Sequence, residues 1–180
     1  MITLSIDHGT TSGYAVFEHT DKEVKLINSG FVYFNSNTKY NEIYKEYNAL
    51  FDKTNPDLIS LEKINLRGTK FNADAILRLC EIRAMIKLIA DERDIECIEA
   101  NPLSMKKLIT GHGNGTKYQV AKEVCLVFEK NFDEIPKIRT KNPLYDECDA
   151  IALGYYNICK YYSLLNKTML NRIYVRNEVE

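Results

Sequence analysis

The sequence predicts a mixed α/β fold in which helices cover both faces of one sheet. Segments with strand patterns come first, strand-like and helix-like segments alternate through the middle, and helical patterns close the chain. The 180 residues, 45% of them hydrophobic, suffice for a core of ordinary size, and the sequence contains no internal repeat or linker. We therefore expect a single domain over residues 1–180.

The N-terminal part of the chain has the pattern of strands joined by tight turns. Residues 2–6 alternate apolar and polar side chains and run into Asp7. Residues 8–13 are rich in glycine and small residues, and residues 14–17 are apolar again, which predicts an antiparallel hairpin. A third strand fits either apolar run within residues 24–34, or both runs as one bent strand.

Helical and strand patterns alternate after these strands. A helix over residues 40–51 is expected to bury Ile43, Tyr47, Leu50 and Phe51. For a longer helix over residues 72–91 the predicted core stripe, with a dimer interface as the alternative, is Ala73, Ile76, Leu77, Cys80, Ala84, Leu88 and Ile89. The other expected elements are strands over 58–62 and 95–100, helices over 102–110, 117–132 and 146–162, and a loop over 136–143.

The composition excludes several classes of protein. Lys and Arg total 24 against 25 Asp and Glu, and the formal net charge of −1 excludes a histone-like polycation. No run approaches the roughly 18 apolar residues that a membrane helix needs, and Asp7 interrupts the stretch that a signal peptide would continue. Five scattered cysteines without a CxxC pair favour a reducing compartment. We expect a cytoplasmic protein that does not bind membranes.

Four carboxylates stand where an active site of this fold class would gather. Asp7 and Glu62 follow two predicted strands, and ligands of open α/β sheets collect at strand ends. Asp146 and Asp149 are one helical turn apart at the start of the last helix, where acidic residues also serve as caps. Four converging carboxylates would repel one another unless Mg²⁺ or Mn²⁺ lay between them. Such a site can hydrolyse phosphodiesters with two metal ions.

A basic segment complements these carboxylates. Residues 101–145 contain eight basic and four acidic side chains, which indicates either a solvated face or an anion-binding surface. Within this segment Gly111, Gly113 and Gly115 alternate with other residues before Thr116 and Lys117. Alternating glycines allow a phosphate to approach the backbone, and a helix start after Thr116 adds amide donors.

These segments resemble the RuvC-type Holliday junction resolvases of the ribonuclease H-like superfamily, in particular their divergent phage and Gram-positive branch. The resemblance rests on Ser5-Ile6-Asp7 with its glycine turn, on residues 59–62, on residues 106–120 and on the Asp146-Glu147-Cys148-Asp149-Ala150 motif. It implies a mixed five-stranded sheet flanked by helices. It also implies a homodimer that faces branched DNA, above all a four-way junction, and uses no small-molecule cofactor.

The resemblance also implies roles for individual residues. The catalytic carboxylates, holding two Mg²⁺ ions for which Mn²⁺ substitutes, would be Asp7, Glu62, Asp146 and Asp149. Lys117 would hold the scissile phosphate, and further DNA contacts are expected from Lys106, Lys107, Gly111 and Gly113. The products would be paired symmetric nicks with 5′-phosphates.

The chain departs from the family at one position. Members often carry a base-stacking aromatic residue three positions after the glutamate, where this chain has Asn65. Phe71 is the next aromatic residue and the candidate to replace it, although a buried Phe is the commoner outcome. Either residue is a candidate DNA contact, and we expect relaxed sequence preference.

Three other functions compete with junction resolution. The same fold and metals would serve a nuclease for flaps, three-way branches and replication forks. Residues 7–12 closely resemble the phosphate-binding hairpin of sugar kinases and actin-like ATPases, although those enzymes need a second domain. A non-catalytic relative that only binds nucleic acid would require the four carboxylates to be incidental.

Overall fold

The described part of the chain contains one five-stranded mixed sheet. The computed structural model describes residues 1–35, 37–64, 73–131 and 142–165. Its strands are β1 (Ile2–Asp7), β2 (Thr11–His19), β3 (Val24–Tyr33), β4 (Leu58–Glu62) and β5 (Glu96–Ala100). Across the sheet their order is β3-β2-β1-β4-β5, so β3 and β5 form the edges. β2 is antiparallel to β1 and β3, whereas β1, β4 and β5 are parallel. The predicted mixed five-stranded sheet is confirmed.

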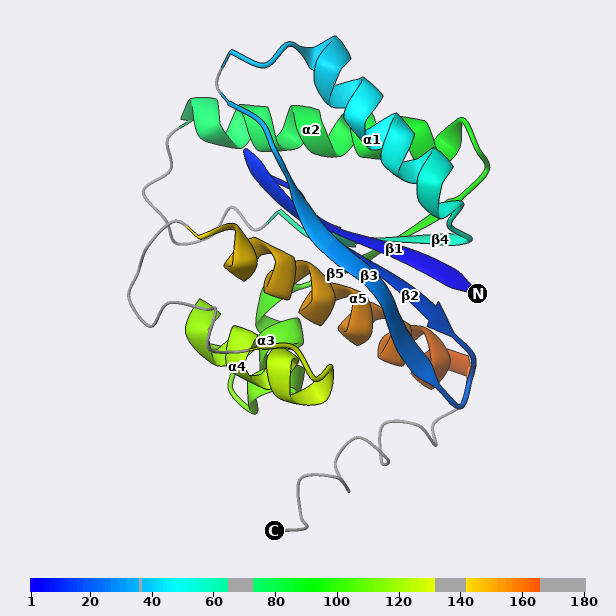
Figure 1. Ribbon diagram of the computed structural model, residues 1–180, viewed down its shortest axis with the longest axis vertical. Helices are drawn as coiled ribbons and strands as arrows, with labels where there is room; N and C mark the ends of the chain where they lie inside the picture. Colours follow the sequence, from blue (N-terminus) through cyan, green and yellow to red (C-terminus); the bar gives the residue numbers. More distant parts are fainter. Residues whose placement is uncertain (36, 65–72, 132–141, 166–180) are drawn as a thin grey trace, which may run out of the picture.

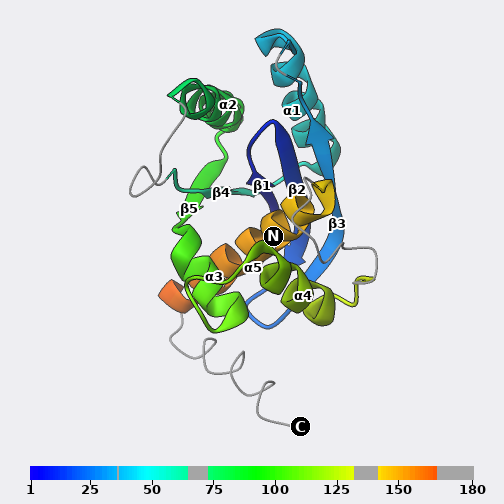
Figure 2. The ribbon, with the colours of Figure 1, turned by 90° about the vertical axis from the view of Figure 1, so that its left-hand side faces the viewer.

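Helices cover both faces of this sheet (Figures 1 and 2). One layer contains α1 (Tyr40–Thr54) and α2 (Ala73–Asp91), and the other contains α3 (Pro102–Thr110), α4 (Lys117–Val127) and α5 (Pro143–Leu165). Leu4 and Ile6 of β1 belong to the core beneath α1 and α2, whereas Ala15 and Phe17 of β2 belong to the core beneath α4 and α5. Successive side chains of a strand point to opposite faces, which gives the sheet its two cores.

Two glycines bring α5 very close to the sheet. A Cβ atom at Gly154 would lie 2.4 Å from Cε2 of Phe17 and 2.8 Å from Cβ of Ser5. A Cβ atom at Gly13 would lie only 1.9 Å from the carbonyl oxygen of Asp146. The first turns of α5 therefore lie directly over the β1–β2 hairpin, at the edge of the sheet where β1 ends.

The N-terminal elements agree with the sequence prediction. β1 and β2 form the antiparallel hairpin, with Asp7 opposite Gly13. β3 spans both apolar runs as one strand, and its pairing with β2 shifts register between Val16 and Phe17. The buried side chains of α1 are those predicted, namely Ile43, Tyr47, Leu50 and Phe51.

Several helix boundaries differ from the prediction: α1 ends at Thr54 instead of residue 51, and α4 and α5 differ as well. α4 ends at Val127 instead of residue 132, and Glu129 shortly after it has φ 52°, a left-handed conformation that a helix of L-residues does not continue through. α5 begins at Pro143 instead of residue 146, because a proline is well accommodated in the first turn of a helix. The predicted loop over 136–143 lies mostly outside the described residues.

The predicted core stripe of α2 is wrong except for Ile89. The helix buries Ile82, Ile86, Ile89 and Ala90, whereas 59% of Leu77 and 51% of Leu88 is exposed. Apolar residues occur around most of the circumference of α2, so periodicity alone does not select the face that meets the sheet. The exposed members of the predicted stripe, here called the outer face of α2, are Ala73, Leu77, Cys80, Ala84 and Leu88.

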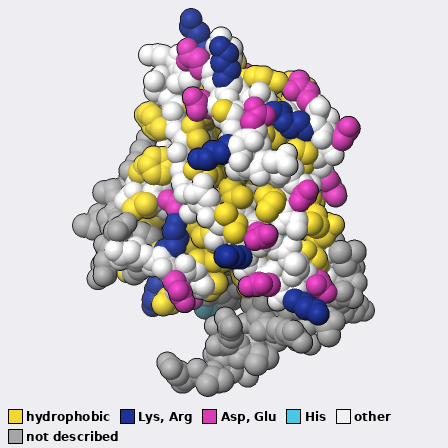
Figure 3. Space-filling model, turned by 45° about the vertical axis from the view of Figure 1, so that its right-hand side comes forward, with side chains coloured by type: hydrophobic (Ala, Val, Ile, Leu, Met, Phe, Trp, Pro, Cys, Tyr) yellow, Lys and Arg dark blue, Asp and Glu magenta, His cyan; other side chains and the backbone are white. Residues whose placement is uncertain are grey.

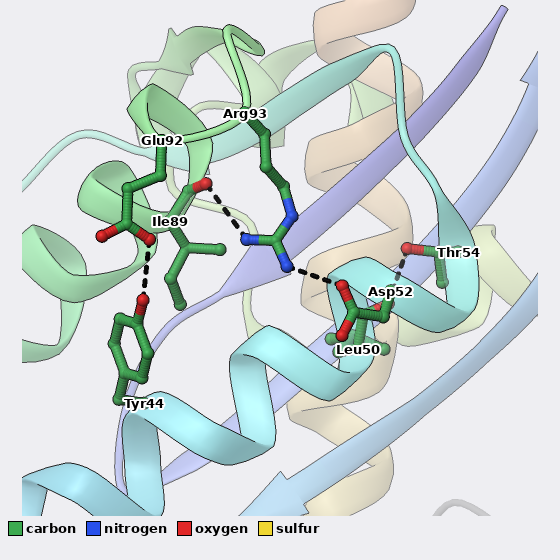
Figure 4. A network of polar contacts seen from close by, with 7 residues as sticks. All are labelled: Tyr44, Leu50, Asp52, Thr54, Ile89, Glu92 and Arg93. Atoms are coloured by element: carbon green, nitrogen blue, oxygen red, sulfur yellow. Dashed lines mark hydrogen bonds and ion pairs between the residues drawn. The ribbon is translucent and has the colours of Figure 1, made fainter.

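Polar contacts tie α1 to the end of α2 (Figure 4). The Arg93 guanidinium donates to Asp52 Oδ1 at 2.6 Å and to the carbonyl oxygen of Ile89 at 3.4 Å. Tyr44 Oη donates to Glu92 Oε2 at 2.7 Å. These contacts fix the two helices of this layer to each other, on the face of the sheet opposite α5.

The surface on the β3 side of the molecule carries charged side chains of both signs with apolar patches between them (Figure 3). Among the exposed large apolar residues, Ile27, Phe31 and Tyr33 belong to the edge strand β3. No helix in the part of the chain that the structure describes is long and apolar enough to cross a membrane.

Candidate active site

The carboxyl ends of β1 and β4 place Asp7 and Glu62 at the same edge of the sheet. The two strands are parallel neighbours, with Ile6 opposite Leu61, so the acidic residue that follows each of these positions ends its strand beside the other. The two carboxyl groups lie close enough for the charge of Glu62 to raise the pKa of Asp7.

The first turns of α5 bring two further carboxylates to this edge. Oxygen atoms of Asp7, Asp146 and Asp149 all lie within 4.8 Å of one another. The site also has a pocket of about 160 Å³, lined by Asp7, Glu62, Met105, Lys106, Lys117, Asp149 and Leu153. Glu62 thus shares the pocket with Asp7 and Asp149, and Asp146 stands beside it.

Lys117 provides the positive charge of the site. Its Nζ lies 2.8 Å from Asp146 Oδ1 and 2.9 Å from Asp149 Oδ2. Lys117 is the first residue of α4, and the Thr116 hydroxyl caps this helix by accepting a hydrogen bond from the Gln119 amide. The cap therefore directs a lysine into the site from a helix start, where a cation opposes the helix dipole.

Burial and mutual repulsion disfavour the charged forms of three carboxyl groups. Burial raises the pKa of Asp7 well above its usual value, and the charges of Asp149 and Glu62 raise it further. Burial is likewise the main reason why the pKa values of Glu62 and Asp149 are raised. Partial burial opposes the charge of Lys117, but Asp149 and Asp146 outweigh it and raise the lysine pKa. The site has more negative charge than one lysine neutralises.

The residues of the site fit a bound divalent cation. Asp149 is only 8% exposed, and its Oδ1 atom is buried without a hydrogen-bond partner within the described residues. A buried carboxylate oxygen without a partner costs desolvation free energy, which a bound cation would offset. Its neighbours offer further hard oxygen ligands, which are the ligands that Mg²⁺ and Mn²⁺ prefer.

The basic segment has a more varied structure than its sequence indicates. Lys106 lines the pocket, whereas Lys107 is exposed outside the lining. Gly111 ends α3 with φ 77°, a conformation that favours glycine. A Cβ atom at Gly113 would come within 3.4 Å of the Leu103 carbonyl oxygen. The backbone conformation explains Gly111 as a turn residue, whereas the space at Gly113 does not require a glycine, and the DNA contacts of both stay predictions.

Some predicted DNA contacts cannot be placed in the structure. Asn65 and Phe71 both lie outside the described residues.

Two histidines lie near the site in the sequence. His112 is exposed and does not line the pocket, whereas His8 is 8% exposed and its Nδ1 lacks a partner among the described residues. Burial, and then the charge of Arg83, lowers the pKa of His8 to about 4.

The sequence reasoning missed a polar cluster behind Asp146. Glu147 is 8% exposed and accepts a hydrogen bond from Ser29 Oγ at 2.6 Å. Lys130 donates to Ser29 Oγ at 2.6 Å and forms an ion pair with Glu147. The cluster joins α5 to β3 and to the chain after α4. The one signal in the sequence was a third acidic residue between Asp146 and Asp149.

Solved structures support the fold. Thermus thermophilus RuvC in complex with a Holliday junction substrate matches with a TM-score of 0.68 and 14% identity, over 92% of this chain and 97% of that one. The fowlpox virus resolvase with its Holliday junction DNA matches with a TM-score of 0.57 and 22% identity, over 92% and 99% of the two chains. At these identities the likeness concerns the fold alone.

The sequence comparisons establish the family. A family model described as crossover junction endodeoxyribonuclease RuvC matches residues 3–155. The RuvC of Brachyspira hyodysenteriae is 32% identical over 159 residues, which cover 86% of this chain and 91% of that protein. The RuvC of Finegoldia magna is 26% identical, covering 88% and 93%. These relatives are bacterial, so the phage part of the expected branch stays a prediction. The family model supports the resolvase interpretation over the sugar-kinase one, and the chain belongs to the crossover junction endodeoxyribonuclease RuvC family.

Proposed function

We propose that this protein is a metal-dependent endonuclease that resolves four-way DNA junctions by paired symmetric nicks. The observation that carries the proposal is the convergence of Asp7, Asp146 and Asp149 oxygens within 4.8 Å, with Lys117 against two of the carboxylates. Membership of the RuvC family supports the same conclusion, because its members are crossover junction endodeoxyribonucleases.

The metal ligands in this proposal are Asp7, Glu62, Asp146 and Asp149. Bound Mg²⁺, or Mn²⁺ in its place, would supply Lewis-acid activation of water and stabilisation of the leaving oxygen. Two ions per site suit the four carboxylates, whose charge Lys117 only partly offsets. The protein's own contribution is to hold the carboxyl groups at the ends of two strands and in the first turns of one helix.

Lys117 is the residue we assign to the scissile phosphate. A lysine ammonium has three donors on a flexible stem, so it can exchange a carboxylate partner for a phosphate oxygen. Hydrolysis joins the water oxygen to phosphorus as the bond from phosphorus to the 3′ oxygen breaks, leaving a 5′-phosphate and a 3′-hydroxyl. Lys106 at the pocket wall, and Lys107, Gly111 and Gly113 beyond it, are the proposed contacts to the flanking backbone.

Paired nicks require two active sites, and we propose a homodimer that supplies them. The outer face of α2 is the surface we assign to the second copy, because Leu77, Cys80, Ala84 and Leu88 follow one another at helical spacings of three or four residues and are all exposed. This assignment takes up the dimer alternative that the sequence offered for the same stripe.

A nicking assay tests the proposal most directly. A synthetic four-way junction, a flap, a three-way branch and a linear duplex are each incubated with Mg²⁺, Mn²⁺ or EDTA. We expect metal-dependent paired nicks on the four-way junction. Equal cutting of flaps and three-way branches would instead identify a broad debranching nuclease, and tight binding without cutting in any metal would identify a non-catalytic relative.

Two variants connect the assay to the site. Asp146→Asn is expected to lower cleavage by at least about a hundredfold and to leave junction binding nearly unchanged, since in this proposal the residue would hold the metals rather than contact the DNA backbone. Lys117→Ala is expected to reduce turnover more than binding. Asp21→Asn, in the turn between β2 and β3, is the matched control. Loss of binding together with cleavage in Asp146→Asn would make this residue structural.

A further inference from the structure

Two exposed aromatic residues stand at the active-site end of β3. Phe31 and Tyr33 are 45% and 67% exposed. β3 is antiparallel to β2, which is antiparallel to β1, so β3 runs in the same direction as β1. The carboxyl ends of β1 and β3 therefore meet the same edge of the sheet, and this edge carries Asp7 (Figure 1).

The pairing of the strands places both rings on the face that carries the site. Asp7 is opposite Gly13, and Gly13 is opposite Phe31. Directly opposed residues of neighbouring strands point to the same face. Gly13 has no side chain, and the backbone of Asp146 occupies the space above it. The start of α5 therefore lies between Asp7 and Phe31 on this face. Tyr33, which is opposite Thr11, is the next residue of β3 on the same face.

The rest of this face of β3 is covered by the protein. Val24 and Leu26 pack against the core beneath α4 and α5. Ser29 is engaged with Glu147 and Lys130. The cover ends there, and the next two side chains of the face are large, aromatic and open to solvent. Exposed aromatic residues gathered at a site edge indicate a binding surface rather than an incomplete core.

We infer that Phe31 and Tyr33 form a stacking surface for unpaired nucleobases of the DNA strand that is cut. The inference rests on the proposed function. Two strand spacings separate Asp7 from Phe31, a distance of roughly 10 Å, which is about three times the axial rise of roughly 3.4 Å in duplex DNA, so bases within a few nucleotides of the cut can reach the rings. Aromatic rings stack on any base, so this surface recognises unpaired bases near the cut without selecting a sequence.

A binding experiment in EDTA tests the stacking surface without requiring cleavage. Phe31→Thr and Tyr33→Thr remove the rings and keep residues that favour strands. Ile27→Thr is the matched control, because Ile27 is 50% exposed on the same strand but lies at the register shift, away from Phe31 and Tyr33. Three ligands are compared: a four-way junction with 2-aminopurine beside the crossover, a single-stranded oligonucleotide and a fully paired duplex.

The double variant is expected to bind the junction and the single strand roughly tenfold more weakly for each stacked base that is lost. Its affinity for the paired duplex should change less than twofold. We expect the wild type to quench the 2-aminopurine fluorescence of the junction and the double variant not to quench it. Tyr33→Phe, which keeps the ring, should retain the junction affinity and the quenching of the wild type. Thermal melting of each variant identifies any loss of folding, in which case the single variants decide.

Two results would overturn the inference. Unchanged binding to the junction and to the single strand in the double variant would show that the rings do not stack on bases. A change from dimer to monomer in light scattering would assign the surface to a second copy of the chain. Failure of the proposed function has a different signature, which is wild-type protein that cuts no branched DNA in any metal.

Discussion

The carboxyl groups of the candidate site make opposite demands on function and stability. Asp7, Glu62 and Asp149 have pKa values raised first by burial and then by one another, so ionising them in the folded protein costs free energy. Lys117 offsets part of this cost through its contacts with Asp146 and Asp149. A bound cation would offset more, which couples metal binding to folding.

Asp7→Asn is therefore expected to stabilise the metal-free protein while abolishing cleavage. The folded pKa of Asp7 lies above its unfolded pKa, so its ionisation at pH 7 favours the unfolded chain, and this penalty vanishes as the pH falls through the folded pKa. We expect the thermal midpoint in EDTA at pH 7 to rise by about 2–4 °C for each 1 kcal/mol of relief. Differential scanning calorimetry measures the shift, and the gain should shrink at pH 4.

His19 makes the stability of the protein depend on pH in the opposite sense. Its buried ring joins Thr3 Oγ1, 2.7 Å from Nε2, to Tyr162 Oη, 2.9 Å from Nδ1. Burial, and then the N-terminal ammonium group, lowers the pKa of His19 to about 4. Because the folded pKa lies below the unfolded value near 6.5, its contribution to stability is complete above pH 6.5 and is lost as the pH falls toward 4.

His19→Gln tests this pH dependence. The variant keeps a side chain that hydrogen-bonds but cannot titrate. We expect it to be somewhat less stable than the wild type at pH 7. Between pH 6.5 and pH 4 it should lose less stability, because the free energy of unfolding of the wild type changes with pH by the uptake of up to one additional proton in the unfolded chain. Urea denaturation across this pH range measures both. Parallel curves for the two proteins would show that the pKa of His19 is the same in the folded and the unfolded chain, which contradicts the lowered value.

At the scale of elements, the approach of α5 to the β1–β2 hairpin assembles the site. β1 supplies Asp7 and β4 supplies Glu62, but Asp146 and Asp149 reach them only because the start of α5 lies against Gly13. The contacts of Glu147 with Ser29 and Lys130 hold the same turn of α5 from the β3 side. The carboxylate cluster thus depends on packing between elements that are far apart in the sequence.

Gly13→Ala is expected to displace α5 from the sheet. The new Cβ would meet backbone atoms of Asp146, the nearest at 1.9 Å, and a helix backbone cannot turn aside as a side chain can. We expect a loss of about 2–3 kcal/mol in stability and a loss of cleavage that added Mg²⁺ only partly restores. Gly30→Ala is the control in the same sheet, because its Cβ would meet the end of the Tyr14 side chain at 2.9 Å. Equal effects of both changes would contradict this account.

At the scale of the whole molecule, the outer face of α2 is an exposed apolar surface that neither core uses. Leu77 and Leu88 expose 59% and 51% of their surface on a helix that buries Ile82, Ile86, Ile89 and Ala90 on its other side. A single active site nicks one strand, so the symmetry of a four-way junction calls for two copies related by a two-fold axis.

Leu77→Glu with Leu88→Glu is expected to convert the dimer to a monomer. Two buried carboxylates in an apolar interface are strongly unfavourable. Light scattering at micromolar concentration measures the change, and the nicking assay should show paired cuts replaced by single nicks. Leu126→Glu on α4, where 65% of the leucine is exposed, is the control. A wild-type monomer at this concentration would remove the basis for paired nicking.

Local patterns in the sequence predicted much of the fold, because each depends on neighbours in the chain. The hairpin of β1 and β2 and the buried face of α1 follow from periodicity and turns, whereas the mixed five-stranded sheet was implied by the family resemblance. Periodicity failed for α2, where apolar residues occur on several sides and only the position of α1 and the sheet selects Ile82, Ile86 and Ile89.

The sequence by itself determined which strand ends and helix turns carry carboxylates, and where a capped lysine enters a helix. It also determined the family, since its motifs occur in a recognisable order along the chain. Only the tertiary structure decided that oxygens of Asp7, Asp146 and Asp149 lie within 4.8 Å, that Lys117 pairs with two of them and that Phe31 and Tyr33 remain open beside them. These relations depend on how closely α5 packs against Gly13 and Gly154 of the folded chain, and such packing between distant segments is not specified by any local pattern.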